Sequence, residues 1–505
     1  MSDADLTPEE IPDGLALRDH PLTARRLEKL ATLRASGVEP YPLGYSRDAL
    51  AAELHERHGA IEPGTSTGET AEVAGRLMNL RRLGKLVFAV LQDVSGQIQL
   101  FADRSGLGGE LFDGFEMLDS GDWVWARGEV ITTRRGELSV RISDFALLAK
   151  GLRPLPEKWH GLVDKERRYR QRELDLLVND DARKIALARV AIVSELRMQF
   201  ESRGFVEVET PVLQTQAGGA LARPFVTQHN ALGVDMYLRI ATELYLKRLV
   251  VGGLERVFEI GRIFRNEGID TKHNPEFTTL EAYQALADYH DVMALIEDVF
   301  SSVAQRTLGS TEFTYDDRAV SLAPPYRRVA LLDLVSEALG EPVSAATSRE
   351  SLQGAMCSAS VEFDPAWGFG KLVQEVFDER VEHTLWEPTF VMDHPVEISP
   401  LARAHRTAEG LTERFELYIA GAEYVDAFTE LNDPIEQRHR FEQQADARAA
   451  GEPEAHPIDE EFLRALEIGM PPTGGLGIGI DRLVMLLTDQ QAIREVILFP
   501  ALKPE

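Results

Sequence analysis

Residues that could bind a phosphate group gather in the middle of segment 255–283. Arg265, Glu267, Lys272 and His273 occupy a polar stretch between two runs in which apolar and polar residues alternate. Such alternation predicts two β-strands joined by a loop. The segment therefore predicts a hairpin whose tip presents an arginine and a histidine to a phosphate-bearing ligand.

The second strand of this hairpin begins near Glu276 and places Phe277, Thr279, Glu281 and Tyr283 on one face, because strand side chains alternate with period two. That face holds two aromatic rings and a carboxylate. A carboxylate partner offsets the high cost of burying an ammonium group. The hairpin could thus hold a triphosphate, a base and an ammonium group together.

A glycine run near the C-terminus, TGGLGIGIDRLVML at 473–486, lacks both common phosphate-binding spacings, GxGxxG and GxxxxGK[ST]. Its glycines instead alternate at 475, 477 and 479, which is typical of a strand that another body approaches closely. A helix that starts near Asp481 would place Arg482 in its first turn, where the helix dipole disfavours a cation. Arg482 is therefore predicted to contact an anionic ligand.

Four acidic residues, Glu416, Glu423, Asp426 and Glu430, punctuate two further predicted strands. Glu416 and Glu423 lie on either side of a turn at Gly421, so a hairpin could bring them together. Paired carboxylates beside phosphates indicate Mg²⁺, which prefers oxygen ligands and keeps several of its waters. Solvated charges on the strand surface are the alternative explanation.

Other residues favour a small cationic substrate. Glu281, Tyr283 and Glu430 offer two carboxylates and a phenol that could surround an ammonium group, which carboxylates bind through strong charge-assisted hydrogen bonds. The GGA stretch at 218–220 exposes backbone groups, and Glu243 precedes a predicted helix. Together these residues predict a pocket for an amine.

The composition excludes several classes of protein. The 505 residues suggest two to four domains, and a hydrophobic content of 44% describes a soluble globular chain without a run of about eighteen apolar residues for a membrane span. The acidic start MSDADLTPEE does not resemble a secretion signal, so we expect the protein in the cytoplasm.

The single cysteine, Cys357, excludes an internal disulfide and is read as a small core residue. A net charge of -29 argues against nonspecific coating of nucleic acid, but a locally basic face could still meet a specific RNA.

Shifts in pattern divide the chain into four parts: a tail and helices at 1–70, a β-rich domain at 71–150, a linker and helix at 151–177, and an α+β domain at 178–505. In the first part, a helix over 22–36 is expected to carry Arg26 and its other basic residues on a solvated face.

Five short alternating stretches within 71–150 predict a small closed barrel of the OB-fold type. Such barrels bind single-stranded nucleic acid by stacking bases on aromatic rings beside basic groups. Phe88 suits that use, with Arg81 upstream and Gln99 on the next strand. A place for Phe88 in the barrel core is an equally open alternative.

The chain resembles the bacterial class II lysyl-tRNA synthetases over nearly its whole length. The resemblance rests on GFVEVETP with its preceding helix, on FRNEGIDTKHNPEF and on GLGIGIDR, in that order. ELYLKRL, HPVEISPLA and FTELND mark the lysine-type subgroup. The resemblance implies an antiparallel-sheet catalytic domain behind an N-terminal five-stranded OB barrel that reads the anticodon, and a homodimer formed through the first signature. It also implies ATP, L-lysine and tRNA(Lys) as substrates, and Mg²⁺ as cofactor.

The resemblance assigns roles to individual residues. For ATP, these are Arg265, Glu267, His273, Phe277 and Arg482, with Arg265 and Arg482 as the catalytic pair. For lysine, they are Gly219, Glu243, Arg265, Glu281, Tyr283, Asp426 and Glu430. Glu416 and Glu423 match the magnesium ligands. The anticodon contacts are Arg81, Phe88, Gln99 and Glu137.

Asp426 departs from the family pattern, which usually has asparagine at this position. An aspartate near the lysine carboxylate should repel it unless a metal ion or a proton offsets the charge.

Three other functions stay open. A sister enzyme for aspartate or asparagine would need a basic residue in place of Glu281 and Glu430, and an enzyme that lysylates a protein would lack the barrel. A nonenzymatic RNA-binding paralogue would have lost Arg265, Glu267 or Arg482.

Overall fold

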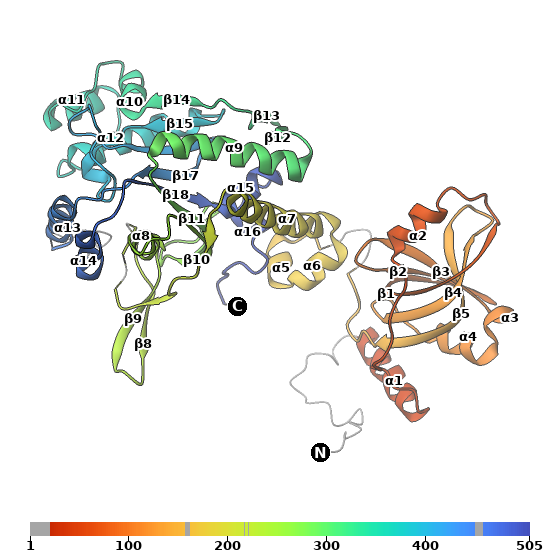
Figure 1. Cartoon of the computed structure of the whole chain (residues 1–505). Helices are drawn as coiled ribbons and strands as arrows, with labels where there is room; N and C mark the ends of the chain where they lie inside the picture. Colours follow the sequence, from red (N-terminus) through yellow and green to blue (C-terminus); the bar gives the residue numbers. More distant parts are fainter. Residues whose placement is uncertain (1–20, 157–161, 217, 221, 450–457, 505) are drawn as a thin grey trace. The chain divides into compact units, whose positions relative to one another are not determined.

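The computed structural model describes residues 21–156, 162–216, 218–220, 222–449 and 458–504. The chain divides into two compact units, Met1–Gly161 and Leu162–Glu505. Figure 1 traces both units along the sequence.

The first unit is the predicted five-stranded barrel, closed in the order β1-β2-β3-β5-β4. Alternate side chains of each strand point inward, so Val87, Ala89 and Leu91 of one strand are buried together with the apolar residues of the others. The first strand begins at Ser66, ahead of the expected boundary at 71. The strands are β1 Ser66–Leu83, β2 Leu86–Gln92, β3 Gln97–Asp103, β4 Trp123–Thr132 and β5 Leu138–Ala149.

Four helices accompany the barrel: α1 Pro21–Ala35, α2 Ala51–His58, α3 Arg104–Leu107 and α4 Gly109–Glu116. The expectation that all basic residues of the first helix are solvated was wrong for Arg26. Its guanidinium is buried and donates to the carbonyl oxygens of Gly151 and Arg153, each across 2.9 Å, and of Ser120 across 2.8 Å. Arg26 therefore ties α1 to the end of the barrel.

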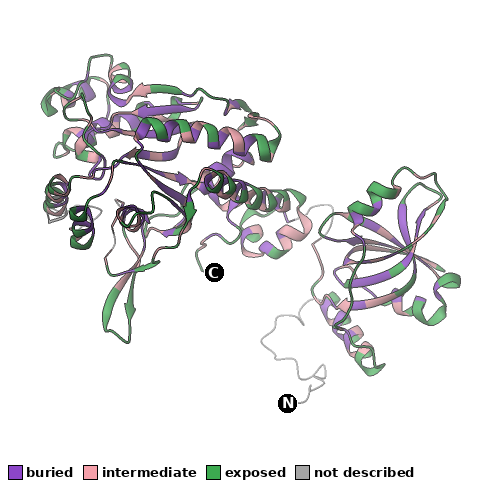
Figure 2. Cartoon of the chain, in the orientation of Figure 1, coloured by how far each residue is buried: buried purple, intermediate pink, exposed green. Residues whose placement is uncertain are grey.

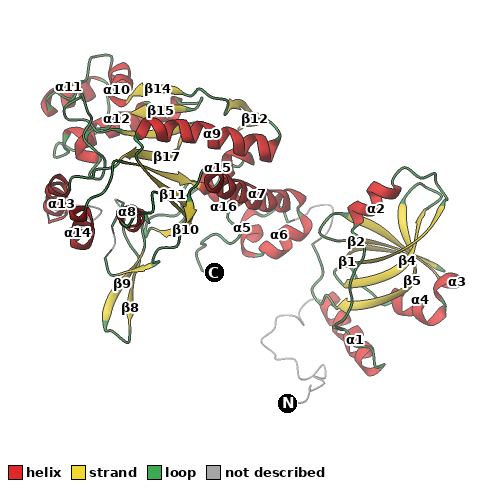
Figure 3. Ribbon diagram, viewed as in Figure 1, coloured by secondary structure: helices red, strands yellow, loops and turns green. Residues whose placement is uncertain are grey.

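The second unit is built on an eight-stranded sheet in the order β14-β15-β16-β17-β18-β11-β10-β6 (Figure 3). The pairs from β15 to β10 are antiparallel, whereas β14 and β6 add parallel edges. This confirms the predicted antiparallel sheet in an α+β fold. Its strands are β6 Val206–Glu207, β10 Arg256–Phe264, β11 Glu276–Ala285, β14 Arg327–Ala330, β15 Thr389–Met392, β16 Arg414–Ile419, β17 Ala422–Thr429 and β18 Thr473–Gly479.

One face of the sheet is covered by helices α7 Asp180–Ser202, α9 Tyr289–Leu308 and α15 Ile480–Leu487. Leu280 and Ala282 of β11 and Leu476 and Ile478 of β18 point into this core. Figure 2 shows the central strands buried. Because strand side chains alternate, the residues between them point to the opposite face, which holds the site.

Smaller elements complete this unit. Helices α10 Leu331–Leu339, α11 Arg349–Ser358 and α12 Phe369–Arg380 surround a separate apolar core, and Cys357 on α11 is exposed, so its predicted core position was wrong. Within the described ranges, no helix has the length and apolar character that crossing a membrane requires. The remaining elements are α5 Lys165–Arg170, α6 Arg172–Val178, β7 Leu213–Gln214, β8 Val226–His229, β9 Val234–Leu238, α8 Glu243–Val251, β12 Glu312–Tyr315, β13 Arg318–Ser321, η1 Glu382–Thr384, η2 Val396–Ile398, α13 Pro434–Ala449, α14 Glu460–Ile468 and α16 Ile493–Val496.

Candidate functional site

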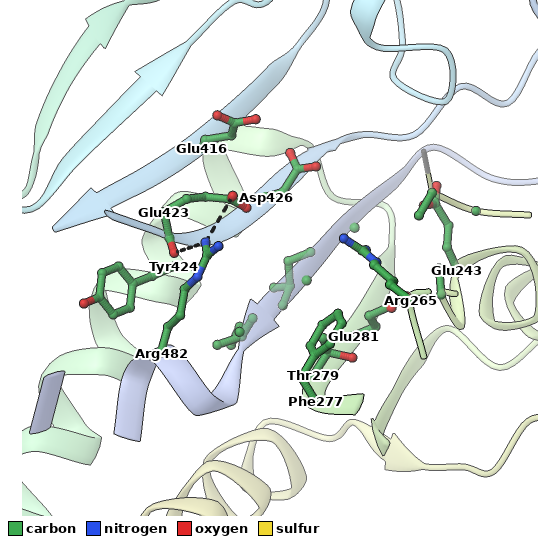
Figure 4. Close-up of a pocket in the computed structure, with 18 of the residues that line it drawn as sticks. Glu243, Arg265, Phe277, Thr279, Glu281, Glu416, Glu423, Tyr424, Asp426 and Arg482 are labelled. Carbon is green, nitrogen blue, oxygen red and sulfur yellow. Dashed lines mark hydrogen bonds and ion pairs between the residues drawn. The ribbon is translucent and has the colours of Figure 1, made fainter. Parts of the chain in front are cut away.

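One cavity of about 520 Å³ lies on the face of the sheet opposite α7 and α9, and every site residue predicted in the second unit lines it. Figure 4 shows several of these residues, among them Glu243, Arg265 and Arg482. Residues from distant segments meet here because β11, β18 and β17 are adjacent in the sheet. The predicted residues that line the cavity are Gly219, Glu243, Arg265, Glu267, His273, Phe277, Glu281, Tyr283, Glu416, Glu423, Asp426, Glu430 and Arg482.

The glycines of β18 form the floor of the cavity. Gly477 pairs with Glu281 of β11 on one side and with Asp426 of β17 on the other. Gly475 has no room for a side chain, because a Cβ there would overlap Glu430 Oε1 and lie 2.7 Å from Tyr283 Cε1. The predicted close approach to this glycine strand is thus confirmed, and the approaching body includes the acidic wall of the cavity.

Arg265 and Phe277 face each other across the hairpin formed by β10 and β11. The Arg265 guanidinium carbon lies 5.2 Å from the centre of the Phe277 ring, and Arg265 Nε is buried with no hydrogen-bond partner among the described residues. A buried donor without a partner is costly, which points to an acceptor supplied by a ligand. In the loop at the hairpin tip, Glu267 is exposed, and His273 Nδ1 lies 2.9 Å from Asp270 Oδ2.

Arg482 lies in the first turn of α15, as predicted, on the other side of the glycine strand from Arg265 (Figure 4). Its Nη1 donates to the backbone carbonyl of Glu423 across 2.6 Å and to Glu423 Oε2 across 3.2 Å. The anionic neighbour within the chain is therefore Glu423, and the two arginines flank the cavity from opposite walls.

The acidic hairpin of β16 and β17 closes around Gly421, although its register differs from a simple pairing of Glu416 with Glu423. A register shift places Glu416 opposite Asp426 and Tyr418 opposite Glu423. Burial raises the pKa of the Glu416 carboxyl to about 8, even though Arg414 beside it favours the ionised form. Glu416 accepts hydrogen bonds from Arg414 Nη2 across 2.5 Å and from the Tyr418 hydroxyl across 2.6 Å.

The chemistry of these acids fits a magnesium ion that is shared with phosphates. Within the described part of the chain, no cluster of three or more His, Cys, Asp or Glu side chains is arranged to hold a metal ion alone. Mg²⁺ commonly takes only one or two carboxylates and completes its shell with waters and phosphate oxygens. Glu416 and Glu423 offer two such ligands, and the Glu423 carboxylate raises the pKa of both Glu416 and Asp426, a repulsion that a cation would relieve.

The opposite end of the cavity carries three buried carboxylates and a phenol. Burial raises the pKa of Glu281 to about 7, and the nearby Glu243 adds to that rise. Burial likewise raises the pKa of the Tyr283 hydroxyl, which therefore stays protonated. Glu430 is fully buried, and its Oε1 has no hydrogen-bond partner among the described residues. An ammonium group of a ligand would satisfy this acceptor.

Sequence reasoning missed two cations that contact these acids, Arg414 and Lys247. Arg414 shares one face of β16 with Glu416 and Tyr418, because the three alternate along the strand, so its position was readable. Lys247 follows Glu243 by one turn of α8, a spacing at which acid and base pair on a helix. The loop from Ile398 to Ala402 also lines the cavity. It lies within HPVEISPLA, which marks the lysine-type subgroup, although no role was predicted for its residues.

In the barrel, three of the predicted contact residues lie on adjacent strands. Arg81 of β1 pairs in register with Phe88 of β2, and Phe88 pairs with Phe101 of β3. Phe88 lies outside the buried barrel core, and its ring stacks on Phe101 with centroids 5.0 Å apart and planes at 24°. Gln99, also on β3, accepts a hydrogen bond from the Ser139 hydroxyl across 2.9 Å.

This stacked pair forms an aromatic surface on the barrel wall. The core alternative for Phe88 was therefore wrong. Phe101 was not predicted, although it follows Gln99 with the period of a strand face. Glu137, the fourth predicted contact, is exposed just before β5.

Comparison with known proteins agrees with both units. A family described as tRNA synthetases class II (D, K and N) matches residues 164–503, and an OB-fold nucleic acid binding domain matches residues 71–148. A lysine–tRNA ligase of Synechococcus sp. (strain RCC307) is 52% identical over 481 residues, which cover 95% of this chain and 96% of the relative. Lysine–tRNA ligases of Gloeobacter violaceus and Moorella thermoacetica are each 50% identical, over 97% and 96% of this chain and 99% of each relative.

Proposed function

Because the chain belongs to the lysine–tRNA ligases within the class II tRNA synthetases, we propose that its cavity activates L-lysine with ATP and passes the lysyl group to the 3′ end of tRNA(Lys). The location that we propose for this reaction rests on one observation. The same cavity combines Arg265, Arg482 and the Phe277 ring with the buried carboxylates of Glu243, Glu281 and Glu430, over a floor without side chains. The first set suits a nucleotide, and the second suits an amino acid with two ammonium groups.

The ATP end of the cavity is formed by the hairpin and α15. We assign the adenine ring to the face of Phe277 and the α-phosphate to Arg265, whose buried Nε has no partner among the described residues. Arg482 approaches from the other wall and is assigned to the γ-phosphate and the second adenine face. Glu267 and His273, in the loop between the two strands, complete the nucleotide contacts.

The lysine end is formed by α8, β11 and the residues after β17. Glu243 and the backbone of Gly219 are assigned to the α-ammonium group, and Glu281, Tyr283 and Glu430 to the ε-ammonium group. A neutral side chain would leave Glu281 and Glu430 buried without a cation, so the same residues provide the selectivity for lysine. Asp426 and Arg265 lie toward the carboxylate of the substrate.

Magnesium is assigned to Glu416 and Glu423, which fit the ion because they supply oxygen ligands beside the arginine that meets phosphate. When bound, the ion would neutralise charge on the phosphates. Arg414 lies beside this site, and its contact with Glu416 already offsets the negative charge of one of the two carboxylates.

The reaction at this site requires no covalent intermediate with the enzyme. The lysine carboxylate attacks the α-phosphorus in line, and pyrophosphate leaves as lysyl-adenylate forms. A ribose hydroxyl at the tRNA 3′ end then takes the lysyl group, and AMP leaves. Arg265 stabilises charge at the α-phosphate, and the remaining contribution is positioning of the two substrates over the glycine floor.

The anticodon of tRNA(Lys) is assigned to the stacked surface of the barrel. Phe88 offers a ring on which a base can stack, and Arg81 offers a positive charge for the RNA backbone. Gln99 and Glu137 offer polar contacts. Because the substrate is a tRNA used in protein synthesis, we place the activity in the cytoplasm.

A homodimer is the assembly that best fits the surface of the second unit. Leu187 and Val190 of α7 are 57% and 64% exposed, and Val206 of β6 is 52% exposed. Val212 and Leu213 are 41% and 46% exposed. Exposed apolar side chains that gather on a surface mark interaction sites, and we infer that a second copy related by twofold symmetry covers these residues. Sedimentation of the purified chain tests this assembly.

The decisive experiment is ATP–pyrophosphate exchange against a panel of amino acids, with and without magnesium. We expect exchange with L-lysine alone and a strong loss when magnesium is chelated. Exchange driven by aspartate, asparagine or another amino acid would reject the assignment of the acidic residues.

A further inference from the structure

Lys247 is a fully buried cation behind the acidic wall of the cavity. It lies on α8, and its ammonium group contacts Glu243 Oε1 across 2.5 Å and forms an ion pair with Glu430 Oε2. The rings of Phe428 and Phe462 lie 5.3 Å and 5.8 Å from its Nζ. The two acids that it contacts are those assigned to the two ends of the substrate.

Burying an ammonium group is costly, and a buried ion pair is seldom more stable than apolar residues of the same size. Apolar residues already surround this position, among them Phe462 and its neighbours on α14, so packing alone does not require a cation. A functional reason for Lys247 is therefore more consistent with its position than a contribution to stability.

The charges at this end of the cavity balance only when Lys247 is counted. Glu243, Glu281 and Glu430 carry three negative charges when ionised, and Lys247 reduces the total to two. Lysine brings two ammonium groups to this end. We propose that Lys247 is a positioning residue that holds Glu243 and Glu430 ionised and in place, so that the pocket is matched to two ammonium groups. This inference rests on the proposed function.

The surroundings of Lys247 support this role. Burial raises the pKa of Glu243 and of Glu430, and contact with Lys247 acts in the opposite direction on both. Lys247 is the largest influence that lowers these two pKa values, so its loss would make both carboxyls bind protons more tightly. The other charged or titratable groups that act on these acids from the neighbouring elements are Glu281 and Tyr283 of β11, Asp426 of β17, and Arg414 of β16.

The test substitutes Lys247→Met, which keeps the length of the side chain and removes its charge. Calorimetric titration of the enzyme with L-lysine, in buffers that differ in ionisation enthalpy, counts the protons released on binding. We expect the variant to release up to about one more proton per lysine than the wild type, because a protonated carboxyl must ionise to meet the ammonium group. The acidic limb of kcat/KM for lysine should move up by about one pH unit or more.

Arg248→Met is the matched control, because Arg248 is the next residue of the same helix and pairs with the exposed Glu461. It should leave proton release and the KM for lysine unchanged. ATP binding by the Lys247 variant, measured separately, shows that the cavity has folded. Unchanged proton release and an unchanged pH profile in Lys247→Met, with ATP bound normally, would overturn the inference.

Two comparisons keep the result unambiguous. If Lys247→Met does not fold, Glu430→Gln is compared with Glu430→Gln combined with Lys247→Met, because removal of both partners leaves fewer buried charges. When lysine binds, the double variant should release more protons than Glu430→Gln alone, because Glu243 would be protonated beforehand once Lys247 is gone. Equal release by the two variants would reject the role of Lys247. Failure of the wild type to exchange pyrophosphate with lysine would instead reject the proposed function itself.

Discussion

Arg414 donates to both carboxylate oxygens of Asp426, from Nε to Oδ1 across 2.8 Å and from Nη2 to Oδ2 across 3.3 Å. The sequence predicts repulsion between Asp426 and the carboxylate of lysine unless a metal ion or a proton intervenes. The partner that offsets Asp426 is instead a guanidinium on the adjacent strand. The same guanidinium also contacts Glu416, so one arginine links the acid expected at the substrate with an acid expected at magnesium.

Asp426→Asn should lower the KM for lysine by about two- to fivefold. The substitution removes one negative charge and leaves Arg414 available to attract the substrate carboxylate, but the effect is modest because the Asp426 side chain is 37% exposed and screened by solvent. Pyrophosphate exchange at varied lysine concentration measures it, with the KM for ATP as control. An unchanged or higher KM for lysine contradicts this prediction.

Glu430→Gln should reduce kcat/KM for lysine in pyrophosphate exchange by more than about tenfold, which corresponds to ~1.4 kcal/mol of transition-state stabilisation. Glu430 is fully buried, so no solvent replaces the lost charge. Glu461→Gln, on the exposed surface of α14, is the matched control and should retain activity. Wild-type kcat/KM in the Glu430 variant would remove this residue from the lysine site.

Gly475→Ala should abolish lysine activation while ATP still binds. The added Cβ would overlap Glu430 Oε1 and press on the Tyr283 ring, so both side chains must leave their places at the ammonium end. The control is Gly354→Ala on α11, where a Cβ meets no atom within 4 Å. Exchange kinetics and ATP titration separate the two halves of the cavity. Retained lysine activation would mean that the acidic wall can move without loss of function.

The pH dependence of lysine activation should follow Glu281. Its folded pKa of about 7 means that the carboxyl is largely protonated below neutral pH, so kcat/KM for lysine should rise as the pH increases through about 7. Glu281→Gln should abolish this limb. The KM for ATP should change little over the same range. A profile that is flat between pH 6 and 8, about one unit on either side of this pKa, contradicts the assignment.

The same shift predicts a trend in stability. Because the folded pKa of Glu281 lies above the ordinary value of 4.5, the folded state binds the proton more tightly than the unfolded state. The contribution of Glu281 to stability is therefore greatest below about pH 4.5, falls as the pH rises, and is lost above about pH 7. Thermal unfolding of the ligand-free protein at several pH values across this range measures this contribution to stability. The pH profile of lysine activation is measured on the same protein.

Phe88→Ala should lower kcat/KM for tRNA(Lys) by about five- to a hundredfold, because stacking of one base contributes about 1–3 kcal/mol. Pyrophosphate exchange does not require tRNA and should be unaffected. Met117→Ala, which changes an exposed apolar side chain of the same unit, is the control. Equal losses in exchange and in tRNA charging would show that the substitution damages the fold instead of a binding surface.

The sequence allowed most of the hairpin face to be predicted, because period-two alternation of Phe277, Thr279, Glu281 and Tyr283 is a local property of β11. All four line the cavity. The contact between Glu430 and Lys247 was not predictable in this way. It depends on the packing of α8 against the strand end at Glu430, and no periodicity within either segment encodes that contact.

Register was the other limit. The turn at Gly421 predicted that Glu416 and Glu423 share a hairpin, which they do, but a shift between Leu417 and Tyr418 sets which residues face each other. Such irregularities depend on cross-strand packing, so the pairing of Glu416 with Asp426 emerged only from the fold. Arg26 illustrates the same limit, because its carbonyl partners lie at the far end of the barrel sequence.

The glycine floor also determines how the two substrates can meet. No side chain rises from Gly475, Gly477 or Gly479, so the floor itself does not divide the ammonium end of the cavity from the arginine end. Under the proposed function, the lysine carboxylate and the α-phosphorus of ATP would approach each other along this strip of backbone. Selectivity must then come from the two walls, and a change of amino acid specificity could be sought on β11 and β17 while the path between the substrates stays intact.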